Sequence, residues 1–160
     1  MIPSQFIPSV EKGVRSVLEC GPLAGYPVDD LKVTVYDGKS HAVDSKDIAF
    51  QAAGRKAMLD ALRAAGCIVL EPVVAIEVSA PEAKLGDITT DLVGRRGQVL
   101  GSSPQAPGVA LIRGQVPLAE LDGYGGRLKS ITAGQGAYSL ELSHYSAVPQ
   151  DVQQRLAGLD

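Results

Sequence analysis

The sequence of 160 residues contains no tryptophan, and aromatic residues make up only 4% of it. Proteins that bind single-stranded nucleic acid by base stacking need exposed aromatic rings, so this class is disfavoured. Basic residues are not in excess either, because 15 Lys and Arg stand against 18 Asp and Glu, which gives a net charge of −3. This balance argues against a polybasic surface that holds nucleic acid by charge alone. Any contact with RNA must be local and depend on shape.

Long apolar segments and cysteine clusters are also missing. No run of residues approaches the length needed to cross a bilayer, and the N-terminus lacks the basic and apolar regions of a signal peptide. The only cysteines, Cys20 and Cys67, do not have metal-ligand spacing, so we interpret them as reduced thiols. These absences predict a cytoplasmic protein.

The common catalytic motifs are absent as well. The sequence has no Gly-x-x-x-x-Gly-Lys-Ser/Thr loop to hold phosphates, no Gly-x-Ser-x-Gly and no His-Glu-x-x-His. We therefore expect no catalytic residue and no metal site in this chain. His144 lies next to Tyr145 in a predicted strand, where a polar residue at a strand end is the simpler interpretation than a catalytic base.

The first half of the chain predicts two helices and a single strand. Apolar residues recur at helical spacing over residues 8–20 and again in an alanine-rich segment, 48–65, whose inward side we expect to include Ala53, Ala57 and Ala61. Residues 31–36 alternate between apolar and polar side chains, which is typical of a strand. Because a lone strand leaves both edges without partners, we interpret residues 1–69 as an incomplete domain.

A turn and an exposed loop precede the second predicted helix. Asp37-Gly38 favours a tight turn, and Asp44 or Ser45 can cap the helix that follows. His41 is left on the tip between them. A metal site or an acid–base pair with the nearby carboxylates is weakly supported, since one imidazole and two carboxylates make a poor zinc site. The local sequence alone favours a solvated loop histidine.

The second half predicts an α+β domain over residues 70–160. Its elements follow the order strand, helix, strand, strand, helix, strand, which is that of a ferredoxin-like fold: a four-stranded antiparallel sheet with both helices on one face. The predicted strands lie near 73–78, 99–101, 110–116 and 138–143, the helices begin at Pro81 and Pro117, and a terminal helix begins at Pro149. Arg95 and Arg96 at the end of the first of these helices either neutralise the helix terminus or contact phosphate or protein; the local sequence favours the first.

Several short motifs resemble, in their order and spacing, the C-terminal part of the elongation factor G family of translational GTPases. The resemblance covers residues 3–150, and its motifs occupy residues 7–13, 21–28, 41–45, 70–72, 86–87, 95–97, 116–120 and 143–145. It implies that residues 1–69 are the latter part of the family's fourth domain, a ribosomal-protein-like βαβ domain with a tip loop near residues 37–45. Residues 70–160 would then be the fifth domain.

The resemblance also implies a function. The family moves transfer RNA and messenger RNA through the ribosome, and some paralogues act in ribosome recycling. Lys39, Ser40 and His41 would then contact the transfer RNA and messenger RNA region of the decoding centre. The fifth domain, with Arg95 and Arg96, would lie near the GTPase-associated region of the large subunit. GTP and Mg would be bound by other domains of the parent, so this chain would hold no cofactor and would not itself be an enzyme. The alternative is a non-catalytic binding module built on a common fold.

Two departures from the family pattern are visible. Lys39-Ser40 stands where the bacterial factor more often has Ser-Tyr, and Gln135-Gly136 stands where Gly-Arg and a small residue are usual. The missing arginine removes a cation from a segment expected to face RNA, which makes a paralogue with altered translocation activity credible. Finally, the unpaired strand 31–36 and the uncovered helix faces predict that this chain forms a homodimer.

Overall fold

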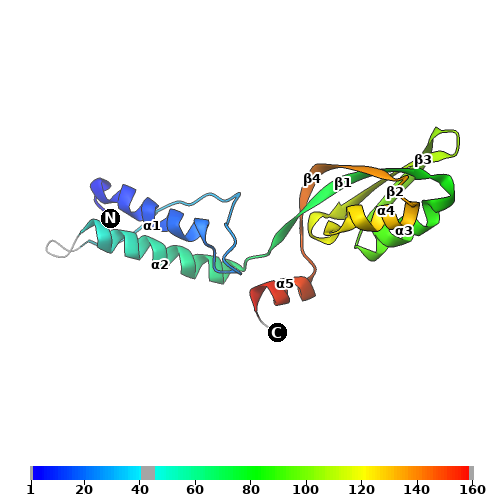
Figure 1. The fold of residues 1–160 in the computed structure, drawn as a ribbon. Coiled ribbons are helices and arrows are strands. Elements are labelled where there is room, and N and C mark those ends of the chain that lie inside the picture. Colours follow the sequence, from blue (N-terminus) through cyan, green and yellow to red (C-terminus); the bar gives the residue numbers. More distant parts are fainter. Residues whose placement is uncertain (1, 41–45, 159–160) are drawn as a thin grey trace. The chain divides into compact units, whose positions relative to one another are not determined.

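A computed structural model of the protein describes residues 2–40 and 46–158 (Figure 1). The chain forms two compact units, of which the first comprises Met1–Val69 with Pro149–Asp160 and the second comprises Leu70–Val148. The boundary after Val69 is the one expected from the sequence. The terminal helix α5 (Gln150–Ala157), expected in the second domain, groups instead with the first unit, where the Val69 N–H donates to the Gln153 side-chain oxygen at 3.0 Å.

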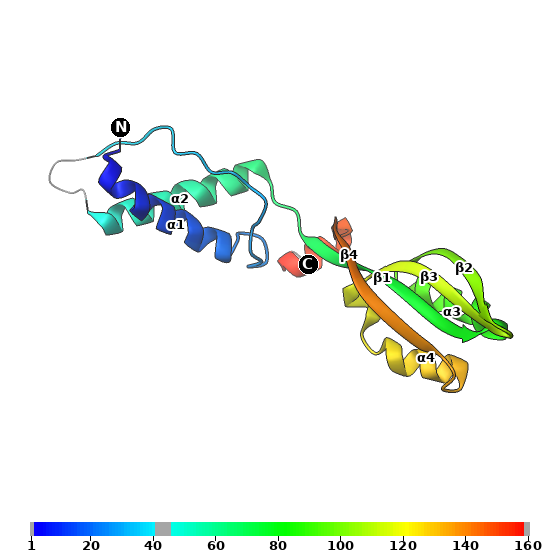
Figure 2. The same ribbon diagram turned by 90° about the horizontal axis from the view of Figure 1, so that it is seen from above.

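Two helices make up most of the first unit and confirm the sequence prediction. α1 (Ile7–Glu19) follows a short 3-10 turn at Ser4–Phe6, and α2 is Asp47–Ala65. The two helices lie side by side (Figures 1 and 2). Their contact is apolar, and its buried side chains are Val10, Val14, Val17, Phe50, Met58 and Leu62.

The inward side of α2 differs from the predicted one. Gly54 is buried against α1, whereas Ala53, Ala57 and Ala61 are exposed. A Cβ on Gly54 would lie 2.6 Å from the carbonyl oxygen of Val10, so the two backbones touch at this point. The close backbone contact turns α2 so that its glycine faces α1 and its alanines do not.

The predicted strand 31–36 does not form. Residues 31–40 are not assigned to any strand, and no other strand occurs in the described part of the first unit. A strand exists only through hydrogen bonds to a neighbouring strand, and the residues of this unit that the structure describes supply none. Leu31, Val33 and Val35 keep the alternation of a strand but are 40–44% exposed.

The start of α2 also differs from expectation. Asp44 and Ser45, the predicted caps, lie outside the described residues. The N-cap position of α2 is Lys46, and no side chain caps the helix there. Asp47 in the first turn accepts a hydrogen bond from the Ser9 hydroxyl at 2.7 Å. This bond joins the beginnings of α1 and α2.

The second unit has the predicted ferredoxin-like fold. Its strands β1 (Leu70–Pro81), β2 (Gln98–Ala106), β3 (Val109–Pro117) and β4 (Ala137–Ala147) form one antiparallel sheet in the order β2-β3-β1-β4 (Figure 2). The helices are α3 (Leu85–Gly94) and α4 (Tyr124–Thr132), and each follows a 3-10 turn, at Glu82–Lys84 (η2) and Leu118–Leu121 (η3).

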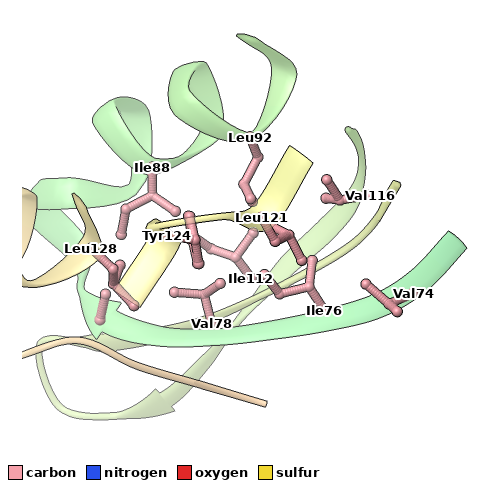
Figure 3. Packing of buried hydrophobic residues seen from close by; sticks show 11 residues of the cluster. Val74, Ile76, Val78, Ile88, Leu92, Ile112, Val116, Leu121, Tyr124 and Leu128 are labelled. Carbon is pink, nitrogen blue, oxygen red and sulfur yellow. The ribbon is translucent and has the colours of Figure 1, made fainter. Parts of the chain in front are cut away.

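The core of the second unit lies between the central strands and the helices. Val74, Ile76 and Val78 alternate along β1 and belong to one buried cluster with Ile88 and Leu92 of α3 (Figure 3). From the other elements the core takes Ile112, Val116, Leu121, Tyr124 and Leu128. All of these side chains are at most 9% exposed, so this unit closes its own core.

Two elements of the second unit differ from the predicted ones. The loop expected between β2 and β3 is mostly strand, and the hairpin turn is only Pro107-Gly108, with Gly108 at a φ of +75°. The helix expected from Pro117 is broken into η3 and α4, because Gly123 adopts a left-handed conformation with a φ of +67°. Two large apolar residues of these predicted helical segments, Leu118 and Val93, are exposed.

Candidate functional sites

The predicted tip is described only in part. Lys39 and Ser40 are exposed, as expected, whereas His41 lies outside the described residues. Asp37-Gly38 does not form the tight turn predicted from its sequence, and neither residue has a positive φ. Instead, the Asp37 carboxylate accepts a hydrogen bond from the Gly38 N–H at 2.7 Å. A Cβ on Gly38 would collide with Ile2, so the segment passes close to the start of the chain.

Two apolar hollows flank the segment 31–39. One, of about 540 Å³, is lined on the α2 side by Ala53, Ala57 and Ala61. The other, of about 550 Å³, is lined on the α1 side by Ile7 and Leu18. Both hollows also include Val33 and Val35. The helix pair therefore has an apolar surface wider than the single extended segment that crosses it.

Arg95 is bound inside the second unit. Its Nε donates to Asp91 at 2.9 Å, and its Nη1 donates to the backbone carbonyls of Glu120 and Asp122. The guanidinium lies 5.3 Å from the ring centre of Tyr124, which is a cation–π distance. Arg95 thus connects the end of α3 to η3 and to the start of α4.

Arg96 makes a second set of contacts in the same region. Its two terminal nitrogens donate to the two carboxylate oxygens of Glu71 at 2.7 and 2.9 Å, and its Nε donates to Glu120 at 2.8 Å. The hydrogen bonds from Arg96 to Glu71, opposed by burial and reinforced by Glu120, raise the Arg96 pKa above its ordinary value. Arg96 has a φ of +59° and Gly97 N–H donates to Leu92 O at 2.9 Å, so Arg96 ends α3 in a left-handed turn.

These contacts give Arg95 and Arg96 a structural role at the end of α3. This role is close to the one that the local sequence favoured, which was to neutralise the helix terminus. The other arginines of the second unit are also paired, Arg113 with Glu77 at 2.8 Å and Arg127 with Asp91 at 2.9 Å. A ribosome contact by Arg95 or Arg96 would have to compete with these bonds. Sequence reasoning missed their carboxylate partners, although the spacing of Asp91 and Arg95, four residues apart on a helix, was a readable signal.

Asp91 lies between two arginines and has an altered pKa. Burial alone would raise the pKa of Asp91, but hydrogen bonds from Arg127 and Arg95, together with their charges, outweigh it and hold the pKa below the ordinary value. The nearby Tyr124 is 1% exposed, and its hydroxyl has no hydrogen-bond partner. Burial, followed by the negative charge of Asp91, raises the Tyr124 pKa to about 12, so this phenol stays neutral.

A groove of about 700 Å³ runs between α3 and α4. Its charged lining consists of Lys84, Asp87, Asp91, Arg95 and Arg127. These charges pair with one another, since Lys84 lies 3.6 Å from Asp87 and both arginines bind Asp91. The groove therefore offers no unsatisfied charge to a ligand.

Neither a metal site nor a membrane span is found in the parts of the chain that are described, residues 2–40 and 46–158. No cluster of His, Cys, Asp and Glu there could hold a metal ion. No helix among these residues is both long and apolar enough to cross a membrane.

Comparison with known proteins places the chain in a family. The sequence model described as "Elongation factor G, domain IV" matches residues 1–66, and that described as "Elongation factor G C-terminus" matches residues 68–156. The chain belongs to the elongation factor G family. The second match extends over α5, which the structure groups with the first unit.

Individual relatives agree with the family assignment. The chain is 45% identical over 158 residues to elongation factor G of Aquifex pyrophilus, covering 99% of this chain and 22% of that protein. It is 46% identical to elongation factor G of Alteromonas mediterranea, covering 97% and 22%. A crystal structure of a Thermus thermophilus protein superposes with a TM-score of 0.83 at 39% identity, covering 99% of this chain and 24% of that one. The chain thus spans about a fifth of the length of its curated relatives.

Proposed function

We propose that this chain is the ribosome-engaging C-terminal region of an elongation factor G-like translational GTPase that promotes movement of transfer RNA and messenger RNA on the ribosome. The observation that supports the proposal is the match of two consecutive family models across nearly the whole chain, at 45% identity to a curated elongation factor G. The boundary after Val69 that separates the two compact units falls close to the boundary between these matches.

Within this proposal, the tip of the first unit reaches the decoding centre. Lys39, Ser40 and His41 would contact the transfer RNA and messenger RNA there, and the exposure of Lys39 and Ser40 is consistent with such a contact. The second unit would lie near the GTPase-associated region of the large subunit. A protein that acts on the ribosome in this way would work in the cytoplasm.

GTP and Mg belong, in this proposal, to other domains of the parent factor. The sequence has no Gly-x-x-x-x-Gly-Lys-Ser/Thr loop, whose backbone amides and lysine hold nucleotide phosphates in such GTPases. The region would bind the ribosome without hydrolysing GTP. Its action would depend on nucleotide bound elsewhere in the factor.

Ribosome binding by this chain tests the proposal directly. We expect the chain to sediment with bacterial ribosomes and to compete with full-length elongation factor G for them, while isothermal titration with GTP gives no binding heat. The readout is the fraction of labelled chain that sediments at increasing competitor. Absence of both sedimentation and competition would remove the proposal, and stoichiometric GTP binding would contradict the assignment of nucleotide to other domains.

The alternative is a paralogue that acts in ribosome recycling, or a non-catalytic ribosome- or protein-binding module. The feature in its favour is the exposed Gln135, in the segment Gln135-Gly136 that by the resemblance lacks an arginine of the family pattern. If the loss of this cation weakens ribosome binding, Gln135→Arg should raise the affinity measured in the sedimentation experiment. An unchanged affinity would remove this argument for altered activity.

We also infer that the isolated chain forms a homodimer through its first unit. The two hollows beside residues 31–39 leave apolar side chains exposed, and the segment itself pairs with no strand among residues 2–40 and 46–158. Burial of each leucine-sized side chain contributes roughly 1.5–3 kcal/mol, which favours association. Light scattering should give a dimer for the full chain and a monomer for a chain that begins at Leu70. The opposite pair of masses would contradict this interface.

A further inference from the structure

The two edges of the sheet in the second unit differ in how they are protected. The strand order β2-β3-β1-β4 places β2 and β4 at the edges, where main-chain groups face away from the sheet. β2 is irregular, because its register with β3 shifts twice and Pro104 lacks an N–H. Bulges and proline commonly prevent an edge strand from pairing with another chain. β2 is therefore a poor site for a further strand.

β4 lacks these protections over residues 137–142, which we call the β4 edge. This stretch pairs with β1 in continuous register, and the one shift, between Val73 and Val74, lies beyond it. It contains no proline and no lysine, and Glu141 is its only charged residue. All of its residues are exposed, and β1 is its only strand neighbour within the described part of the chain (Figure 2). The β4 edge thus offers unpaired main-chain groups over about 20 Å.

An apolar strip runs along the β4 edge. Tyr138, Leu140 and Leu142 pair with three core residues of β1 and therefore point to the same face of the sheet as the core. Those β1 residues are at most 4% exposed, whereas the three β4 residues are 40–58% exposed. The Tyr138 ring meets the Tyr124 ring of α4 edge to face at 5.1 Å, which places the strip beside this helix. We call Tyr138, Leu140 and Leu142 the β4 strip.

We propose that the β4 edge binds an extended segment of a partner protein, which joins the sheet as an additional strand. Main-chain hydrogen bonds to β4 hold the segment, and its alternate apolar side chains cover the β4 strip. A docked helix could cover the strip, but it would leave the main-chain groups of the edge unpaired. This site is separate from the tip and from the arginine contacts, and it does not rest on the proposed function.

Glu141 specifies the charge of the bound segment. Its side chain alternates with the β4 strip and so lies on the opposite face of the sheet. It is exposed and takes part in no ion pair among residues 2–40 and 46–158. Because opposite charges on neighbouring strands stabilise a sheet, a segment with lysine or arginine beside Glu141 is favoured. A second copy of the β4 edge has no cation to place there, which favours a different protein.

Binding of a labelled peptide tests this proposal. The probe is a peptide of alternating valine and lysine, about eight residues long, and the readout is its fluorescence anisotropy with the full chain. Two further peptides are N-methylated, one at every valine and the other at every lysine, so that each loses the N–H groups of one edge only.

We expect the unmodified peptide to bind saturably. One methylated peptide should bind at least about 10-fold more weakly, because it loses several main-chain hydrogen bonds to β4. The other should stay within about 2-fold of the unmodified peptide, since its methyl groups face away from β4. Equal losses in the two methylated peptides would overturn the proposal, and so would an absence of saturable binding at up to about 1 mM peptide.

A pair of chain variants locates the peptide on β4. Glu141→Gln combined with Leu142→Ser changes exposed side chains of the β4 edge, and we expect it to weaken binding by about 10-fold or more. Glu82→Gln combined with Leu100→Ser is the matched control, because both residues are exposed and lie outside β4. The control should stay within about 2-fold of wild type, and circular dichroism should show that both variants are folded. Equal weakening in the two variants would overturn the site.

Light scattering distinguishes a partner segment from a second copy of the chain. We expect wild type and the variant Glu141→Gln with Leu142→Ser to have equal masses at the same concentration, because no second copy occupies the β4 edge. A smaller mass for the variant would show that two β4 edges pair with each other. That result would overturn the partner assigned here.

Discussion

Replacement of Gly54 by alanine is expected to destabilise the first unit by about 1–3 kcal/mol, which is the usual cost of overpacking. A loss of stability is unusual for this substitution, because alanine normally stabilises a helix interior by about 1 kcal/mol relative to glycine. Here the added Cβ would lie 2.6 Å from the Val10 carbonyl oxygen and 3.1 Å from its Cα, so the helices must move apart. Gly13→Ala should act similarly, since its Cβ would collide with the carbonyl oxygen of Gln51.

Hydrogen exchange followed by mass spectrometry checks this prediction because it reports on each unit separately. Amides of α1 and α2 should lose protection in Gly54→Ala, and those of the β1–β4 sheet should not. Gly126→Ala in α4 is the matched control, since Gly126 is helical and exposed and its Cβ would meet nothing within 4 Å. It should stabilise α4 by up to about 1 kcal/mol. Unchanged or increased protection of α1 and α2 in Gly54→Ala would refute the close helix crossing.

Replacement of Asp91 by asparagine should destabilise the second unit by roughly 2–3 kcal/mol at neutral pH. The Asp91 carboxylate, whose side chain is 12% exposed, accepts charge-assisted hydrogen bonds from Arg95 and Arg127, both at 2.9 Å. Such a bond contributes about 1.5–3 kcal/mol where it is buried. The Arg127 side chain is 56% exposed, so its share is smaller.

The pH dependence of the stability difference between wild type and Asp91→Asn identifies the electrostatic origin of that difference. The folded state lowers the Asp91 pKa, so the unfolded chain takes up a proton first as the pH falls. The stabilisation is therefore complete above the unfolded value of about 3.9 and is lost as the pH falls through the lower folded value. Urea unfolding of wild type and Asp91→Asn should differ by a constant amount between about pH 5 and 8 and converge below about pH 4. A difference that is independent of pH down to about pH 2 would rule out this linkage.

The success of the sequence prediction in the second unit has a simple cause. The spacing of its apolar residues changes in turn between that of a strand and that of a helix. Each predicted strand or helix packs against others from the same segment, Leu70–Val148. The interior side chains of β1, for example, follow directly from the alternation of Val74, Ile76 and Val78. The wrong predictions in this unit occur at glycines with a positive φ. Gly123 breaks one predicted helix, and Gly108 permits a two-residue hairpin turn.

Less of the candidate site could be predicted from the sequence. Lys39 and Ser40 were identified as exposed because turn residues surround them, and the motif order identified the family. The carboxylate partners of Arg96 were not identified, because Glu71 and Glu120 are distant from it in sequence and meet it only after the chain folds. Long-range ion pairs leave no periodic pattern in a sequence.

Local periodicity and short motifs thus determined the helices, the sheet of the second unit and the membership of the chain in the elongation factor G family. Only the tertiary structure decided which backbone and charged groups have hydrogen-bond or ion-pair partners. The segment 31–36 has the alternation of a strand, but pairing requires a neighbouring strand, and the described residues of its unit supply none. Arg95 and Arg96 have the charge of an RNA contact, but carboxylates of the same unit already bind them. Hydrogen bonds and ion pairs depend on distances in space, which the order of residues along the chain does not contain.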